Sequence, residues 1–151
     1  MQDLNCQIAL KIYNKPYFTI RNGLFGKTSR GNYYKPISYH NPSGLSNRHK
    51  NKWSIRQDEQ YYVFKLADES VWNCSNNDGS LFAIIQDGKI VLGALGEVLG
   101  YFEVPVNNGD PWHGYPIFSS EFELGEDLLD KWEQDKIVSP IIRKKIGKGQ
   151  I

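Results

Sequence analysis

Hydrophobic and polar residues alternate near the start of the chain, a pattern typical of a half-buried strand. The alternation covers residues 5–13, and a second short apolar run at 17–20 predicts another strand. A turn signal, Asn22-Gly23, follows these runs. Neither period continues between Arg21 and Arg56. We therefore expect a long irregular segment there, and loops of this length are often functional.

The middle of the chain is rich in strand-like runs. Asp87-Gly88 separates two apolar runs, and this pair favours a hairpin turn because a type I′ turn needs positive φ at both central residues. The arms of this hairpin are expected at residues 81–86 and 89–95. Further strands are predicted at residues 59–66, 70–74 and 98–104.

The hydrophobic period changes to that of a helix after an expected loop at residues 107–116. Apolar residues then recur at helical spacing, at Leu124, Leu128, Leu129 and Trp132. Ser120 and Glu123 have the spacing of a capping box. Gly125 weakens a helical first turn by roughly 1 kcal/mol relative to alanine, so the helix is expected to start there.

A second C-terminal helix is bounded by clear start and stop signals. Ser139 is a suitable N-cap, Pro140 suits the first helical position, and Gly147 is expected just past the end. The sequence therefore predicts a single α+β domain over residues 1–151. Its antiparallel sheet contains the central Asp87-Gly88 hairpin, and two C-terminal helices follow the sheet.

Composition excludes several classes of protein. The 151 residues are 40% hydrophobic and 23% charged, which is unlike a disordered tail or a disulfide-dense mini-protein. The longest uncharged apolar run, 90–96, is too short to span a bilayer, and the first ten residues lack a basic region. We expect a cytoplasmic protein that has no membrane partner.

Cysteine usage gives no reason to expect a metal or a cofactor. The two cysteines, Cys6 and Cys74, form no Cys-x-x-Cys pair, and no histidine stands at metal-finger spacing. Cys6 lies on the apolar face of the first predicted strand, where a buried, unreactive thiol is the expected state.

The net charge of +1 is a cancellation of opposed blocks. Residues 1–56 hold ten bases and one acid (+9), residues 57–135 three bases and sixteen acids (−13), and residues 136–151 five bases (+5). Aromatic rings are interleaved with the bases of the first block. Lysine and arginine suit phosphates, and flat rings suit unstacked bases, so this segment is a candidate binding surface for an anionic partner.

The candidate binding residues of this segment are Arg21, Arg30, Tyr33, Tyr34, Tyr39, Arg48, Lys50, Lys52 and Trp53. The partner would be a nucleic acid or an acidic protein. The segment contains no known nucleic-acid-binding motif. In the alternative interpretation, these bases lie against the acidic block of the same chain as surface ion pairs.

Histidines offer the only route to catalysis that the residues suggest. His40 and His49 lie among Arg48, Lys50 and Lys52, a set that a metal-independent nuclease could use for acid–base chemistry. Residues 21–56 contain no Asp or Glu, which argues against a divalent-metal site within this segment. Ordinary solvated histidines are the favoured interpretation.

The loop at 107–116 concentrates rigid and aromatic residues. Trp112 and Tyr115 are candidate contact residues because rings on a constrained loop lose little entropy on binding. His113, three residues after Asp110, is a third catalytic candidate, although no serine or cysteine nucleophile is apparent. The favoured interpretation is structural, with the rings plugging the core and the prolines ending a strand.

Three functional hypotheses follow. The leading one is a non-catalytic binding protein that recognises an anionic partner through the basic, aromatic segment 21–56. The second is a metal-independent nuclease or toxin-like enzyme that uses His40 or His49. The third is an inhibitor or immunity-type protein whose acidic middle and first C-terminal helix mask a basic partner.

Overall fold

A computed structural model describes residues 23–37 and 51–151 of the chain. The strands predicted at 5–13 and 17–20 lie outside these residues, as does Cys6. The described elements are β1 (Phe25–Gly26), β2 (Tyr33–Tyr34), α2 (Gln57–Glu69), β3 (Leu81–Ile84), β4 (Leu99–Glu103), β5 (His113–Ile117), α3 (Glu126–Gln134) and α4 (Pro140–Gly147). The predicted α+β class, with an antiparallel sheet followed by two C-terminal helices, is confirmed.

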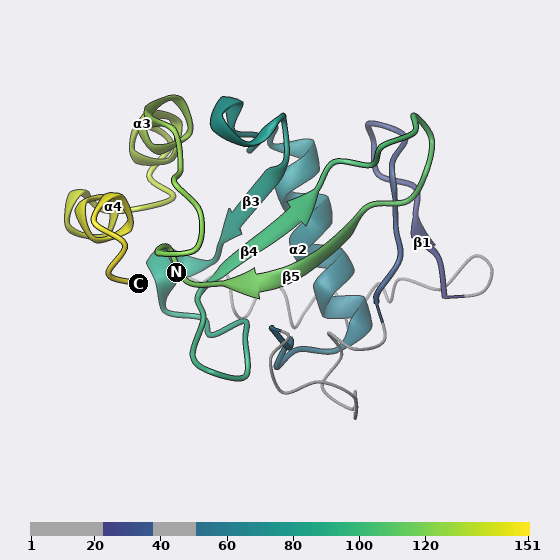
Figure 1. The fold of residues 1–151 in the computed structure, drawn as a ribbon, viewed down its shortest axis with the longest axis horizontal. Helices are drawn as coiled ribbons and strands as arrows, with labels where there is room; N and C mark the ends of the chain where they lie inside the picture. The colour runs from purple at the N-terminus through teal and green to yellow at the C-terminus, as the bar shows by residue number, and fades with distance from the viewer. Residues whose placement is uncertain (1–22, 38–50) are drawn as a thin grey trace.

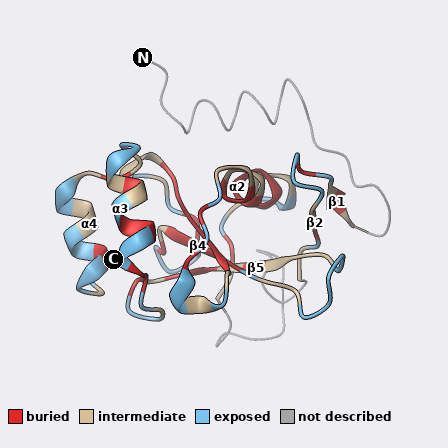
Figure 2. Ribbon diagram, turned by 90° about the horizontal axis from the view of Figure 1, so that it is seen from above, coloured by how far each residue is buried: buried red, intermediate tan, exposed pale blue. Residues whose placement is uncertain are grey.

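The main sheet consists of three antiparallel strands in the order β3-β4-β5. Helix α2 lies on one face of this sheet, while α3 and α4 stand at one end and the β1–β2 pair at the other (Figure 1). Phe102 of β4 points toward α2, where its ring meets Phe64 at a centroid distance of 5.4 Å. Buried residues occur on both α2 and the strands of the sheet (Figure 2).

The strand predicted at 59–66 is wrong, because these residues form most of helix α2. Tyr61-Tyr62-Val63-Phe64 has high β-propensity and favours a strand in isolation. Five buried residues nevertheless recur at helical spacing, Gln60, Tyr61, Phe64, Ala67 and Asp68, and Tyr62 and Val63 are buried beside them. At the first turn, the Glu59 carboxylate accepts a hydrogen bond from the Arg56 backbone N–H (2.9 Å), which helps to start the helix.

The predicted hairpin exists as the antiparallel pair β3-β4, although its second arm is not at residues 89–95. Gln86 and Asp87 both have positive φ, and the Gly88 N–H donates to the Ile85 carbonyl (3.1 Å), so the Asp-Gly signal does mark a tight turn. Residues 89–97 then fold back on themselves instead of pairing with β3. The Glu97 carbonyl accepts from the Leu92 N–H at 2.8 Å.

The strand predicted at 70–74 is also wrong. Helix α2 ends at the C-cap Ser70, and Val71 has a positive φ of 58°, a turn conformation that interrupts extended backbone. Only an isolated bridge between Asn73 and Leu81 lies in this stretch. The strand predicted at 98–104 is confirmed as β4.

Strand β5 (His113–Ile117) occupies part of the stretch 107–116 that was expected to be a loop, so that prediction is wrong for residues 113–116. Pro116 discouraged a strand assignment, but β5 is the edge strand of this sheet, where proline is tolerated. The outer carbonyls of β5 accept side-chain hydrogen bonds. The Trp53 indole N–H donates to Gly114 (3.1 Å) and the Asn51 amide donates to Pro116 (2.6 Å).

Both predicted C-terminal helices are confirmed. The N-cap of α3 is Gly125, so the capping box predicted at Ser120 and Glu123 is wrong; the Cys74 sulfur accepts from the Gly125 N–H instead (3.0 Å). Cys74 is a free, buried thiol. In α4, the Ser139 hydroxyl accepts from the Ile142 N–H (3.3 Å), as predicted for an N-cap. Gly147 is the last residue of α4, so the helix ends one residue later than expected.

The β1–β2 pair is joined to the end of α2 through Asp68, which is 1% exposed. The Asp68 carboxylate accepts hydrogen bonds from the Thr28 hydroxyl (2.6 Å) and the Asn32 amide (3.1 Å). Arg30 lies 3.9 Å from the same carboxylate. Among the residues that the structure describes, no helix is long and apolar enough to cross a membrane.

Candidate functional site

Six of the predicted site residues lie outside the described residues: Arg21, Tyr39, His40, Arg48, His49 and Lys50. These include both histidines of the nuclease hypothesis and most of the bases of the proposed anionic-partner surface. Both hypotheses therefore stay predictions for this segment.

Two rings of the basic, aromatic segment lie in the core. Tyr34 is fully buried, its hydroxyl donates to the Gln60 side chain (3.0 Å), and burial raises the pKa of this phenol well above its ordinary value. Trp53 is 1% exposed and stacks on Phe102 with ring centroids 5.8 Å apart. Neither ring is available to stack on a ligand base.

The other described residues of this segment also make contacts within the chain. Arg30 donates to the Asp68 carbonyl (3.2 Å) in addition to its ion pair with that residue. The Lys52 carbonyl accepts from the Ala94 N–H (2.8 Å). Tyr33 is half-buried in β2, and its carbonyl accepts from the Trp112 N–H (2.8 Å). Of these contacts, the Arg30–Asp68 ion pair is of the kind that the alternative interpretation expects between the bases and the acidic block of the same chain.

The candidates from the 107–116 stretch separate into two environments. Trp112 packs on Phe64 of α2 (5.7 Å between ring centroids), so its ring plugs the core as the structural interpretation predicted. His113 begins β5, and its Nδ1 lies 2.9 Å from the Lys35 carbonyl. The Asp110 carboxylate accepts from Asn107 instead of orienting His113. The residues therefore do not assemble an Asp–His catalytic pair.

A further cluster forms where β4 and β5 face away from α2, in which Tyr101 is buried, His113 and Tyr115 are half-buried and Glu103 is exposed. The strand register places Tyr115 opposite Tyr101 and His113 opposite Glu103, so these four side chains share one face of the sheet. Phe122 stacks on Tyr101 with ring centroids 4.3 Å apart. We call this cluster, with two neighbouring acids, the acidic aromatic face: Asp78, Tyr101, Glu103, His113, Tyr115, Glu121 and Phe122.

Burial and nearby negative charges both shape the electrostatics of the acidic aromatic face. Burial, Tyr101 and the negative charges of Glu103 and Glu121 together raise the pKa of Tyr115 to about 12. Burial likewise raises the pKa of Tyr101, with additional effects of Glu103 and Asp78. Asp78 and Glu103 are exposed and form no ion pair with any described residue. Their charge is therefore open to an external cation.

Two hollows lie beside this face and share the stretch from Glu103 to Val106. One has a volume of about 370 Å³ and is lined by residues that include Asp78, Ser80 and Tyr101. The other, of about 250 Å³, is lined by residues that include Asp110 and His113. Val106, between them, is 99% exposed. The carboxylate of Glu103 therefore lines both hollows.

The acids of α3 differ from Asp78 and Glu103 because they lie close to an arginine. Arg143 of α4 lies 2.5 Å from Glu126, 2.6 Å from Asp130 and 3.3 Å from Glu133. The hydrogen bond to Asp130 is the largest of several effects that raise the pKa of this guanidinium. One arginine thus forms ion pairs with three carboxylates of the first C-terminal helix.

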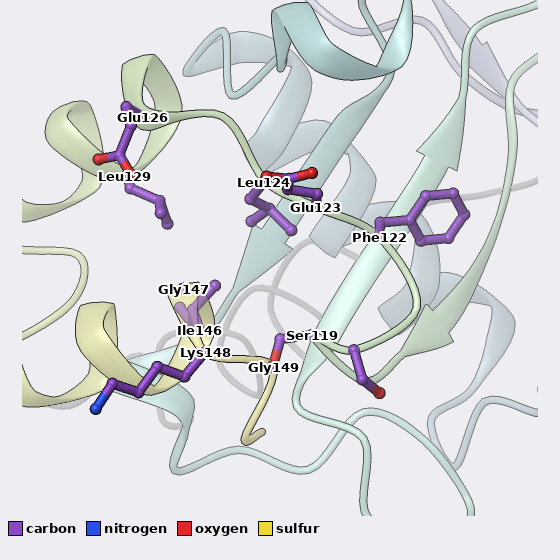
Figure 3. Close-up of a pocket in the computed structure, with 11 residues that line it drawn as sticks. Ser119, Phe122, Glu123, Leu124, Glu126, Leu129, Ile146, Gly147, Lys148 and Gly149 are labelled. Atoms are coloured by element: carbon purple, nitrogen blue, oxygen red, sulfur yellow. The ribbon is translucent and has the colours of Figure 1, made fainter.

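A third hollow, of about 390 Å³, lies between residues 119–126 and the end of α4. Leu124 and Leu129 point into it, whereas the Lys148 ammonium points away and Phe122 points toward the sheet (Figure 3). Leu129 and Ile146 are only 2% and 3% exposed, so this hollow offers little apolar surface to a ligand.

Within residues 23–37 and 51–151, no three His, Cys, Asp or Glu side chains gather in a way that could hold a metal ion. The sequence indicated His113 and Tyr115 of the acidic aromatic face but missed Asp78, Tyr101 and Glu103. Pairing of β4 with β5 brings Tyr101 and Glu103 beside His113 and Tyr115, whereas Asp78 follows a turn outside the strands. The predicted strand at 98–104 already contained Tyr101 and Glu103. Comparison of the chain with protein-family models, curated proteins and solved structures finds no match.

Proposed function

We propose that this protein is a non-catalytic binding protein whose acidic aromatic face recognises a basic protein partner. This corresponds to the inhibitor or immunity-type hypothesis, with the binding surface on the sheet instead of on α3. The observation that carries the proposal is the state of Asp78 and Glu103, which are exposed beside aromatic rings and form no ion pair within the described residues.

The side chains of this face match the chemistry of lysine and arginine. Carboxylates form charge-assisted hydrogen bonds with guanidinium and ammonium groups, and aromatic faces attract the same cations. The rings of Tyr101, Tyr115 and Phe122 pack on one another, with centroid distances of 4.3 Å and 5.3 Å, so little side-chain entropy is lost on contact. The two hollows beside Glu103 give room for side chains of a partner.

The test is binding of a fluorescein-labelled arginine-rich peptide, measured by fluorescence anisotropy at low salt. The variant D78N/E103Q removes two charges from the acidic aromatic face. Asn tolerates the left-handed backbone of Asp78 (φ 56°), so the fold is expected to be kept. We expect this variant to bind the peptide roughly tenfold more weakly.

The matched control is E126Q/D135N, which removes two exposed charges from α3 and its C-cap. We expect its affinity to stay within about twofold of the native protein. Equal weakening by both variants would mean that the peptide responds to net charge alone, which would overturn the proposal. Absence of peptide binding by the native protein would overturn it as well.

A further inference from the structure

Helix α4 presents its lysines to solvent on one side. The exposed residues Ile141, Lys144, Lys145 and Lys148 follow the spacing i, i+3, i+4 and i+7 along α4 and its C-cap, so they share one face. The other face carries Ile142, Arg143 and the buried Ile146. We call Lys144, Lys145 and Lys148 the lysine face.

The lysine face is open to an external partner. Arg143, the neighbouring base on the inner side of α4, forms ion pairs with the acids of α3. In contrast, none of the three lysines forms an ion pair with a described residue. The stretch from Lys136 to the last residue also contains no Asp or Glu that could compensate this charge. The dipole of α4 accounts for cations in its last turn, because it favours positive charge there. It does not account for the lack of acids in this stretch.

We infer that the lysine face binds the phosphate backbone of a nucleic acid, independently of base sequence. Lysine ammonium groups act as point charges that contact phosphates, and such contacts supply most of non-specific nucleic-acid binding. Lys144 and Lys148 lie one turn apart, about 6 Å along the helix axis, so they can contact different phosphates of one strand.

The surroundings of the lysine face favour a nucleic acid over an acidic protein. Protein interfaces have an apolar, aromatic core and are depleted in lysine. Here Ile141, 69% exposed, is the one large hydrophobic residue on the exposed side of α4. The inference is separate from the proposed function, because it uses a different surface and a partner of opposite charge.

The test is anisotropy of a labelled DNA duplex of about 20 base pairs, titrated with the full chain over a series of salt concentrations. For the native protein, the logarithm of the binding constant is expected to fall linearly with the logarithm of salt concentration. The variant K144Q/K148Q removes two phosphate contacts, so the magnitude of the slope is expected to fall by about 2. Its affinity at low salt is expected to fall roughly tenfold.

The matched control is K27Q/K35Q, which removes two exposed lysines at the β1–β2 end of the molecule, away from α4 (Figure 1). We expect this control to keep its slope and affinity. Equal losses in both variants, or a loss in the control alone, would overturn the inference, and the latter would assign the binding to segment 21–56. Absence of DNA binding, or equal affinity for polyglutamate, would overturn it too.

Discussion

Two acidic regions of this chain hold their charge differently. On α3, the carboxylates of Glu126, Asp130 and Glu133 meet one guanidinium from α4, so their charge is largely satisfied inside the molecule. On the acidic aromatic face, Asp78 and Glu103 meet no described cation. Helix α3 is the more acidic in sequence, yet the face on the sheet is the better candidate for binding. The number of acids in a region is therefore a poor guide to the charge that it offers a partner.

The largest expected effect is on the free energy of unfolding. It compares a carboxylate that supports the fold with one that is open to a partner. The variant Asp68→Ala leaves buried donors of Thr28 and Asn32 without an acceptor, so we expect a loss of about 3 kcal/mol in the free energy of unfolding. Glu103→Gln is expected to change it by less than about 0.5 kcal/mol. Urea denaturation measures both. Similar losses in the two variants would show that Glu103 also supports the fold.

A smaller effect tests the state of the acids on α3. Arg143→Met removes their common partner, and the expected loss is about 1 kcal/mol because these groups are partly exposed and screened by solvent. The loss should shrink at about 0.5 M salt. Thermal unfolding at both salt concentrations measures it, with Lys144→Met on the exposed side as the control. If the arginine-rich peptide binds to α3 in the Arg143→Met variant, the ion pairs of Arg143 account for the difference in binding between the two regions.

The smallest effect is the titration of Tyr115. Burial and the nearby Glu103 and Glu121 raise the pKa of Tyr115 from 10.0 to about 12. Since the folded pKa is the higher one, this group contributes stability that is complete below pH 10.0 and is lost as the pH rises toward about 12. Tyrosinate absorbance of the native protein and of Tyr115→Phe isolates the transition.

Charge neutralisation then shows whether the carboxylates act on Tyr115 as inferred. Glu103→Gln should lower the pKa of Tyr115, because it removes one of the negative charges that disfavour tyrosinate. Glu126→Gln, on α3, should leave it unchanged. An equal shift in both variants would indicate a long-range effect of net charge instead of a local one.

Local signals predicted some elements well and others poorly. Helix α4 was predicted correctly at its start, because Ser139 and Pro140 act within one turn of chain. Helix α2 was missed because Tyr61, Tyr62 and Val63 favour strands in isolation, whereas packing of one helical face against the sheet decides the outcome. Strand β5 was missed because Gly114 and Pro116 are typical of loops, and only its place at the sheet edge makes them acceptable.

The candidate site was predicted only in part for a similar reason. Tyr115 was marked as a contact candidate and His113 as a catalytic candidate from their own loop. Their neighbours Glu103 and Tyr101 come from a different strand, and the register that pairs them depends on the whole sheet. Burial also removed candidates, because Tyr34 and Trp53 were needed in the core. Composition cannot separate a ring that binds a ligand from a ring that fills the interior.

The hydrogen bonds on the outer edge of β5 also bear on how copies of this chain behave at high concentration. An exposed edge strand is a template on which strands from other molecules can add, and such addition leads to aggregates. Here Pro116 has no N–H to offer, and the carbonyls of Gly114 and Pro116 are already engaged by Trp53 and Asn51. The edge is thus blocked along this stretch against growth of the sheet from one molecule to the next.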